Sequence, residues 1–268
     1  MMANRVKRIL AEGGVALGTM VFEFATSGIG RIIAGSGADF AIFDMEHSGW
    51  STETVKSLVS SCGGTGLVPM ARVPATEYHL IARVLDIGAM GIMVPMVQSE
   101  EQARRIVQSA KYPPVGRRGA AFGVAHDDYS RGDVAEKIRT ANVEGLLIAL
   151  IETVEGIEAV QHIAAVDGID VLWVGHFDLT NSLGIPGQFQ HPSYLEAVER
   201  VLAACRKHGK AAGFMVASPE EAEAKLEQGF RCLAYWGDIW LYQQALTNGL
   251  ERTRSKVERL PASSSCHP

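Results

Sequence analysis

Two acidic residues, Glu152 and Asp178, each follow a short apolar run and have the spacing of a metal site. The runs 146–151 and 171–174 are too short and too rich in branched side chains for helices, whereas 154–165 between them has helical spacing. In a parallel sheet, such a strand-helix-strand unit brings the carboxyl ends of its two strands side by side. Two carboxylates there suit Mg²⁺ or Mn²⁺, with positions left for water and substrate. Alternatively, each acid merely caps the helix or loop that follows.

Other polar side chains also follow apolar runs. They are Glu23, His47, Arg72 and Asp238. His47 follows Asp44, and a histidine held in one tautomer by a carboxylate can act as a general base near neutral pH. Arg72 is suited to clamp a substrate carboxylate. The structural alternatives are a surface histidine beside a helix and an arginine in an ion pair.

Several further acidic residues and one histidine are weaker candidates for the same chemistry. Asp86, counted with the catalytic candidates, ends a predicted helix, where a carboxylate is unfavourable unless it has a partner. Glu46 is a weaker candidate, expected to pair with a cation. His126, Asp127 and Asp128 are interpreted as a solvated loop, because adjacent side chains point apart.

The chemistry available to these candidates is narrow. No lysine stands at the carboxyl end of a predicted strand, so a Schiff-base mechanism lacks its nucleophile. No cysteine or serine has a paired base. Two acids, a histidine and an arginine suit the binding of a 2-oxo acid through a metal and the transfer of a proton next to its carbonyl.

The elements that must position these residues form a regular alternation without a compositional break. The predicted strands are 15–22, 40–44, 67–73, 90–94, 146–151, 171–174, 212–216 and 232–235. This pattern predicts an α/β fold, a single-domain (β/α)₈ TIM barrel over residues 1–260, with a disordered tail over 261–268. A large open sheet is the alternative. Barrel enzymes carry their sites at the carboxyl ends of the strands, where the polar candidates would converge.

One connection, 112–139, is too long for an ordinary loop between a strand and a helix. It contains Pro113-Pro114 and several aromatic and basic side chains. Loops of this length in compact domains are usually functional or disordered. Its content favours a lid.

Composition narrows the class of partner. The chain has 268 residues, 47% of them hydrophobic and 21% charged, with a net charge of −5 and scattered basic residues. This argues against nucleic-acid binding. No run is long enough to span a membrane, and the first eight residues lack a signal peptide's apolar core. We therefore expect a cytoplasmic protein with a small-molecule partner, and neither nucleic acid nor membrane as a partner.

Six short motifs then occur in order over nearly the whole chain. They are Asp44-x-Glu46-His47, Arg72-x-Pro74, Val94-Pro95-Met96-Val97-Gln98, Tyr112-Pro113-Pro114 with Gly116-x-Arg118-Gly119, Ile151-Glu152-Thr153 and Gly175-x-x-Asp178-Leu179. In combination they resemble the metal-dependent pyruvate aldolases of the 4-hydroxy-2-oxoheptane-1,7-dioate aldolase (HpcH/HpaI) family.

The resemblance implies a specific site. A divalent metal, Mg²⁺ or Mn²⁺ with Co²⁺ also allowed, would bind Glu152 and Asp178, and pyruvate would chelate it. Arg72 would lie near the carbonyl oxygen, and His47, supported by Asp44, would be the acid/base. The implied reaction is reversible cleavage of a 4-hydroxy-2-oxo acid into pyruvate, or a related 2-oxo acid, and an aldehyde through a metal-stabilised enolate. The resemblance also implies a homo-oligomer, a trimer or hexamer, in which a neighbour's loop completes the site.

Two places depart from the family pattern. Leu150 stands where the family usually carries Gln, and His176-Phe177 replace Pro and a small residue. We therefore expect a tighter or differently shaped substrate pocket, with these three residues and Arg118 among its contacts. His176 would either donate to the substrate or join the metal.

Three other functions stay open on the same barrel. A lyase for acyl-CoA esters of hydroxy acids should show basic residues around the mouth, for which Arg117, Arg118 and Arg131 offer little. A 2-oxo-acid decarboxylase or synthase resembling macrophomate synthase would use the same metal and acids. A non-catalytic ligand-binding barrel is motivated by Leu150 and Phe177.

Overall fold

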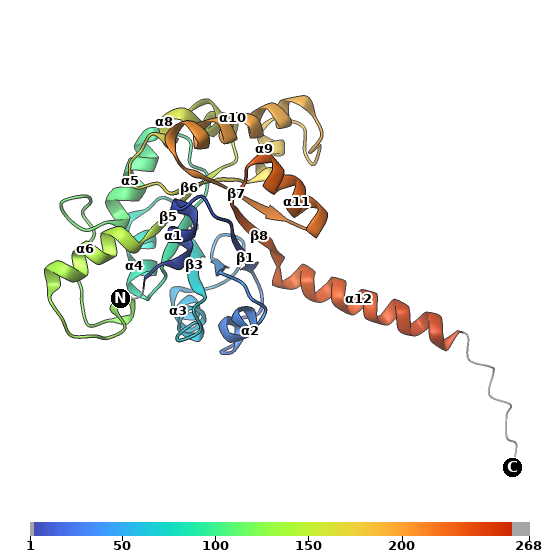
Figure 1. Ribbon diagram of the computed structural model, residues 1–268, viewed down its shortest axis with the longest axis horizontal. Helices are drawn as coiled ribbons and strands as arrows, with labels where there is room; N and C mark the ends of the chain where they lie inside the picture. The colour runs from blue at the N-terminus through green and yellow to red at the C-terminus, as the bar shows by residue number, and fades with distance from the viewer. Residues whose placement is uncertain (1–2, 259–268) are drawn as a thin grey trace, which may run out of the picture.

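The structure, a computed structural model, describes residues 3–258. Within this range eight parallel strands close into a barrel in which each strand pairs with the next and β8 pairs with β1 (Figure 1). The strands are β1 (Ala16–Val21), β2 (Phe40–Asp44), β3 (Val68–Arg72), β4 (Gly91–Val94), β5 (Leu146–Ile151), β6 (Val171–Val174), β7 (Ala211–Val216) and β8 (Cys232–Gly237). The predicted single-domain (β/α)₈ barrel is confirmed. The tail predicted over 261–268 lies outside the described residues.

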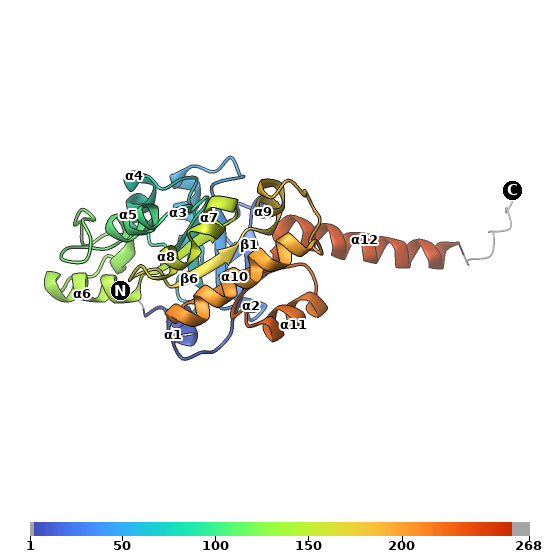
Figure 2. The same ribbon diagram turned by 90° about the horizontal axis from the view of Figure 1, so that it is seen from above.

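Helices surround the barrel (Figure 2). They are α1 (Arg5–Ala11), α2 (Ile29–Gly35), α3 (Thr52–Ser61), α4 (Tyr78–Asp86), α5 (Glu100–Ala110), α6 (Val134–Glu144), α7 (Val154–Glu158), α8 (Val160–Ala164), α9 (His176–Ser182), α10 (Pro192–His208), α11 (Pro219–Gln228) and α12 (Asp238–Val257). Over residues 3–258, none of them is both long enough and apolar enough to cross a membrane.

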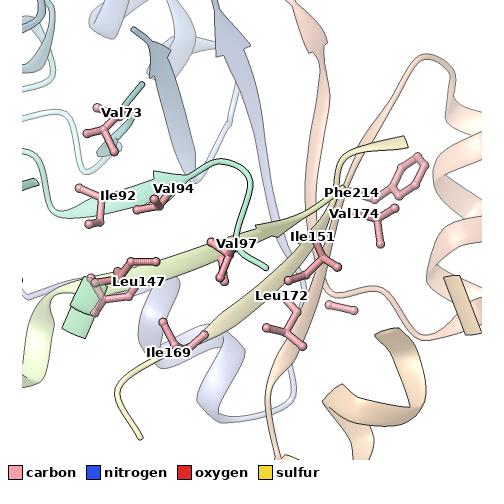
Figure 3. Packing of buried hydrophobic residues seen from close by; sticks show 14 of the residues in the cluster. Val73, Ile92, Val94, Val97, Leu147, Ile151, Ile169, Leu172, Val174 and Phe214 are labelled. Atoms are coloured by element: carbon pink, nitrogen blue, oxygen red, sulfur yellow. The ribbon is translucent and has the colours of Figure 1, made fainter. Parts of the chain in front are cut away.

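The strands are buried on both faces, which explains their continuous apolar runs. Outward-facing side chains such as Val94, Leu147 and Leu172 pack under the helices (Figure 3). Inward-facing side chains such as Phe40 and Ile148 form a second cluster that fills the barrel. Because the interior is filled, a ligand can reach the barrel only at its ends.

The segment predicted as a long loop contains more structure than its sequence indicates. Helix α6 begins at Val134, and the side chain of its N-cap Asp133 accepts the N–H of Glu136. The expectation that Asp127 is solvated is wrong. Its carboxylate is buried and forms an ion pair with Lys137 at 2.6 Å, because α6 packs back over the loop.

The helix predicted over 154–165 is instead two short helices, α7 and α8, which meet at Ala159. Near this point a Cβ on Gly156 would approach the carbonyl oxygen of Val97 to 2.8 Å. The backbone is therefore packed closely against the loop after β4, a long-range contact that helical spacing cannot reveal.

The last helix, α12, departs from the usual arrangement because it extends away from the barrel (Figures 1 and 2). It contains no buried residue, and Tyr242, Leu246 and Leu250 are exposed along it. An apolar groove of about 420 Å³, here called the β1–α2 groove, is lined by residues that include Leu17 and Ile32. Within residues 3–258, this apolar surface is left uncovered.

Candidate active site

A cavity of about 330 Å³ opens at the carboxyl ends of the strands, and we call it the barrel-end cavity. Its lining residues are Met20, Phe22, His47, Arg72, Met93, Leu150, Glu152, Trp173, Val174, Gly175, His176, Phe177, Asp178, Met215 and Trp240. The structure thus brings together His47, Arg72, Glu152 and Asp178. Leu150, His176 and Phe177 line the same cavity.

Glu152 directly follows β5 and continues the inward phase of Ile148 and Leu150, since side chains alternate along a strand. Its side chain is buried, and its Oε1 accepts the N–H of Met96 at 2.7 Å. A Cβ on residue 175 would overlap its Oε2, so the carboxylate occupies space that only Gly175 leaves free.

Burial raises the pKa of Glu152 to about 7. The N–H of Met96 opposes this shift, and the negative charges of Glu46 and Asp178 add to it. The ionised form of a carboxyl group that is buried beside other negative charges is stabilised by a nearby cation.

Asp178 follows β6, the strand next to β5, since Ile151 pairs with Val174 in the register of the two strands. The structure places it in the first turn of α9, which begins at His176, rather than in a turn after the strand. Its side chain is exposed and lines the cavity. The predicted side-by-side arrangement of the two acids is present.

Arg72, the last residue of β3, pairs in register with Asp44, the last residue of β2. Both side chains are buried, and the Nε of Arg72 donates to Asp44 Oδ1. The Nη1 of Arg72 lies 3.1 Å from Glu46 Oε2. Burial raises the pKa of Glu46, although the charge of Arg72 acts against this. The two carboxylates hold the guanidinium group in a fixed orientation.

His47 is oriented differently from the expectation. The Asp44 carboxylate accepts the backbone N–H of His47 at 2.8 Å, so it shapes the turn instead of holding the ring. The ring Nε2 lies 3.8 Å from Glu46 Oε2, and 59% of the His47 side chain is exposed. Glu46, which sequence reasoning ranked as a weak candidate, is therefore the carboxylate beside both Arg72 and His47. Its position in the Asp44-x-Glu46-His47 motif is the sequence feature that could have indicated this role.

Asp86 and Arg118 do not line the barrel-end cavity. Asp86 ends α4 and forms an ion pair with Arg118 at 2.6 Å, which supplies the partner that its helix end requires. Arg118 lines a different pocket together with Met90, which directly precedes β4. Because Met90 lies at the amino end of the strands, this ion pair is remote from the cavity of its own chain.

His176 packs into an aromatic cluster. Its ring stacks on Phe214 with the ring centres 4.9 Å apart and the planes at 20°, and it also contacts Phe177 and Phe189. Burial lowers the pKa of His176 to about 4, with a further contribution from Lys225. This geometry does not support the predicted role as a metal ligand or substrate donor, because the ring faces other rings.

The cavity offers a metal a small set of protein ligands. Among residues 3–258, no three His, Cys, Asp or Glu side chains gather closely enough to hold a metal by themselves. Glu152 and Asp178 would therefore share a cation with water and substrate oxygens. Together with Glu46 they bring more negative charge than Arg72 offsets, and hard oxygen donors of this kind fit Mg²⁺ or Mn²⁺.

The closed barrel and the acidic cavity at the carboxyl ends of its strands define a (β/α)₈-barrel enzyme. Residues 20–239 match the model of the HpcH/HpaI aldolase/citrate lyase family. The chain belongs to this family of carbon–carbon lyases, as the sequence motifs predicted.

Known proteins support this assignment over almost the full length. The chain is 34% identical over 255 residues to a 2-keto-3-deoxy-L-rhamnonate aldolase of Klebsiella pneumoniae, covering 95% of each chain. It is 32% identical to a hydroxypyruvate/pyruvate aldolase of Roseobacter denitrificans, covering 88% of this chain and 91% of the relative. The crystal structure of an HpcH/HpaI aldolase from Desulfitobacterium hafniense matches with a TM-score of 0.89 and 34% identity, over 97% of this chain and 98% of that one.

Proposed function

We propose that the protein is a divalent-metal-dependent aldolase that reversibly cleaves 4-hydroxy-2-oxo acids to pyruvate, or a related 2-oxo acid, and an aldehyde. The observation that carries this proposal is the gathering of Glu152, Asp178, Arg72 and His47 in one cavity. The names of the Klebsiella and Roseobacter relatives, a keto-deoxy sugar-acid aldolase and a pyruvate aldolase, agree with a 2-oxo acid as one reactant.

Glu152 and Asp178 are the proposed ligands of the metal, Mg²⁺ or Mn²⁺, with Co²⁺ as a further choice. A bound divalent cation would draw electron density from the 2-oxo group and stabilise the enolate charge. Arg72 adds a fixed positive charge to the same region. Because Asp44 and Glu46 already hold its guanidinium group, little reorganisation is needed when charge develops.

His47 is the proposed base. In cleavage, His47 would take the proton of the substrate 4-hydroxyl and the C3–C4 bond would break. The electron pair of that bond would form the enolate of pyruvate. The 4-carbon would leave as the aldehyde. Glu46, whose Oε2 lies 3.8 Å from Nε2 of the His47 ring, would act as a positioning residue.

The alternatives receive less support. A CoA ester would need basic residues at the mouth, and Arg118 is instead paired with Asp86 outside the cavity. A 2-oxo-acid decarboxylase or synthase would use the same acids and is separated from the aldolase by its products. A non-catalytic barrel is disfavoured because Glu152, Asp178, Arg72 and His47 line one cavity.

We also propose a homo-oligomer in which α12 of one copy covers the β1–α2 groove of another. The support is the matching chemistry, since Tyr242, Leu246 and Leu250 form an apolar stripe on α12 and the groove is lined by apolar side chains. Trimeric or hexameric assembly and a cytoplasmic location stay predictions.

The test of the proposed function is a metal-supplemented screen of pyruvate and related 2-oxo acids against a set of aldehydes. We expect Mg²⁺- or Mn²⁺-dependent condensation, and we expect the enzyme to exchange the methyl protons of pyruvate in D₂O. Glu152→Gln should abolish both reactions. Metal-independent turnover, or full activity of Glu152→Gln, would contradict the proposal.

A further inference from the structure

The barrel-end cavity has two chemically different halves. Its charged and ionisable side chains lie at or after the ends of four strands: Arg72 ends β3, Glu152 directly follows β5, and His47 and Asp178 lie in the segments after β2 and β6. On the opposite arc, from β7 through β8 to β1, the lining residues are Met215, Trp240, Phe22 and Met20. The second half is therefore lined by methionine and aromatic side chains.

The rings of the apolar half are held in place by one another. Phe22 and Trp240 pack edge to face with their centres 5.0 Å apart. Phe177 lies at the border between the halves, directly before Asp178, and 58% of it is exposed. Such an exposed ring beside charged groups is available to cover a ligand.

Aromatic side chains continue beyond the cavity. A neighbouring hollow of about 540 Å³, here called the side cavity, shares His176, Phe177 and Met215 with it. The side cavity adds the rings of Phe189 and Phe214, and its lining also includes the polar side chains of Gln190, Glu221, Lys225 and Gln228. Since the ring of His176 stacks on Phe214 and also contacts Phe177, the boundary between the two cavities is formed by aromatic faces.

We propose that this apolar half binds the aldehyde, and that the aldehyde carries an aryl or alkyl group without hydroxyls. The inference rests on the proposed function, in which the 2-oxo acid occupies the half that contains Glu152 and Asp178. A polyhydroxylated chain would lose water hydrogen bonds against Met20, Phe22 and Met215, which offer no strong donor or acceptor in return. An apolar chain of equal length gains from leaving water.

The test compares aldehydes of equal carbon number with pyruvate as the donor and Mn²⁺ present. Butanal is paired with erythrose, and 3-phenylpropanal provides an extended apolar case. We expect kcat/KM for butanal to exceed that for erythrose by about tenfold or more, the discrimination that one or two unpaired polar groups produce. Equal values, or a preference for erythrose, would overturn the inference.

Two measurements separate this inference from the proposed function. Exchange of the pyruvate methyl protons in D₂O needs no aldehyde, so exchange without discrimination between aldehydes contradicts the inference alone. Quenching of Trp173 and Trp240 fluorescence by 3-phenylpropan-1-ol needs no turnover. Saturable quenching by this alcohol but not by glycerol supports the apolar site even without catalysis, and its absence refutes the site.

Substitutions locate the effect. Phe177→Ser should reduce the ratio of kcat/KM for 3-phenylpropanal over erythrose about tenfold. Met215→Ser changes a residue of β7 and should reduce the same ratio. A similar effect of both substitutions would show that a local shift of α9 is not the cause. Val143→Ser removes an exposed apolar side chain of α6, far along the chain from this surface, and should leave the ratio unchanged. Unchanged ratios in both cavity variants would contradict the inference.

Discussion

The carboxylate of Glu152 depends on a neighbouring residue that has no side chain. A Cβ on Gly175 would meet both the Oε2 and the Cβ of Glu152. Gly175 also links β6 to α9 and so sets the position of Asp178. Both proposed metal ligands therefore rely on the same glycine.

Gly175→Ala is expected to lower aldolase kcat/KM about 100-fold, because displacing a catalytic group by about 1 Å costs a factor of this size. Metal affinity, measured by titration calorimetry, should fall as well. Gly35→Ala is the control, since a Cβ there meets nothing within 4 Å. Wild-type activity in Gly175→Ala would show that Glu152 tolerates displacement.

Lys111 is a second residue whose environment has a measurable consequence. It is buried, and its ammonium group donates to the carbonyl oxygens of Asn142 at 2.7 Å and Gly145 at 2.8 Å. Burial lowers its pKa to about 7, and the nearby charge of Lys7 acts in the same direction. Between this value and the unfolded lysine pKa of about 10.4, the unfolded chain binds the extra proton.

The free energy of unfolding should therefore rise with pH from about 7 towards 10, by at most about 1.4 kcal/mol per pH unit from this group. Urea denaturation of the wild type and Lys111→Met at several pH values measures the difference. Ionisable groups other than Lys111 are common to both proteins and largely cancel. A difference that is flat or decreases with pH would contradict the prediction.

At the scale of elements, Asp238 shows how the barrel is closed. Its position after an apolar run predicts a polar residue of the barrel mouth. In the structure its carboxylate accepts the backbone N–H groups of Phe22 at 2.9 Å, Glu23 at 3.0 Å and Phe24 at 2.7 Å. It thus joins the start of α12 to the segment after β1 and fixes the ring of Phe22.

Asp238→Ala should destabilise the protein by about 1–3 kcal/mol, because three backbone donors lose a charged acceptor. Thermal or urea unfolding measures this loss. Glu251→Ala, which removes an exposed carboxylate from the same helix, is the matched control. Equal stability of the two variants would mean that water replaces the lost acceptor at no cost.

The elements also show what the sequence could and could not predict. The strands were located because branched apolar runs alternate with helical spacing, and alternation along β5 placed Glu152 inward. The orientation of His47 could not be predicted from the sequence. It depends on Asp44 and Glu46, and the side chain of Arg72 on β3 holds these two carboxylates in place. Helix α6 was missed because its sequence lacks a clear apolar face, although Asp133 was a usable capping signal.

At the scale of the whole molecule, α12 and the β1–α2 groove are the features that a single copy leaves unexplained. The three exposed apolar residues on α12 recur every four positions and so share one helical face. The groove lies beside β1, where Leu17 and Ile32 are exposed. Exposed apolar surface of this kind usually marks an interaction site.

Leu246→Asp should lower the molar mass measured by light scattering after size-exclusion chromatography, and dissociation should increase on dilution. Asn248→Asp adds the same charge to α12 about half a turn away from the apolar stripe and should leave the mass unchanged. An unchanged mass in Leu246→Asp would exclude α12 as the contact.

Helix α12 also connects the cavity to a site at which a probe can be attached. Trp240 lines the cavity at the first turn of a helix of 20 residues, which extends about 30 Å into the surroundings. A rod fixed at one end converts a small rotation at its base into a large displacement at its tip. In the proposed oligomer this far end lies against another copy, so a spin label or fluorophore there would show whether ligand entry at Trp240 is transmitted to the neighbouring subunit, without any change to the residues that carry out the chemistry.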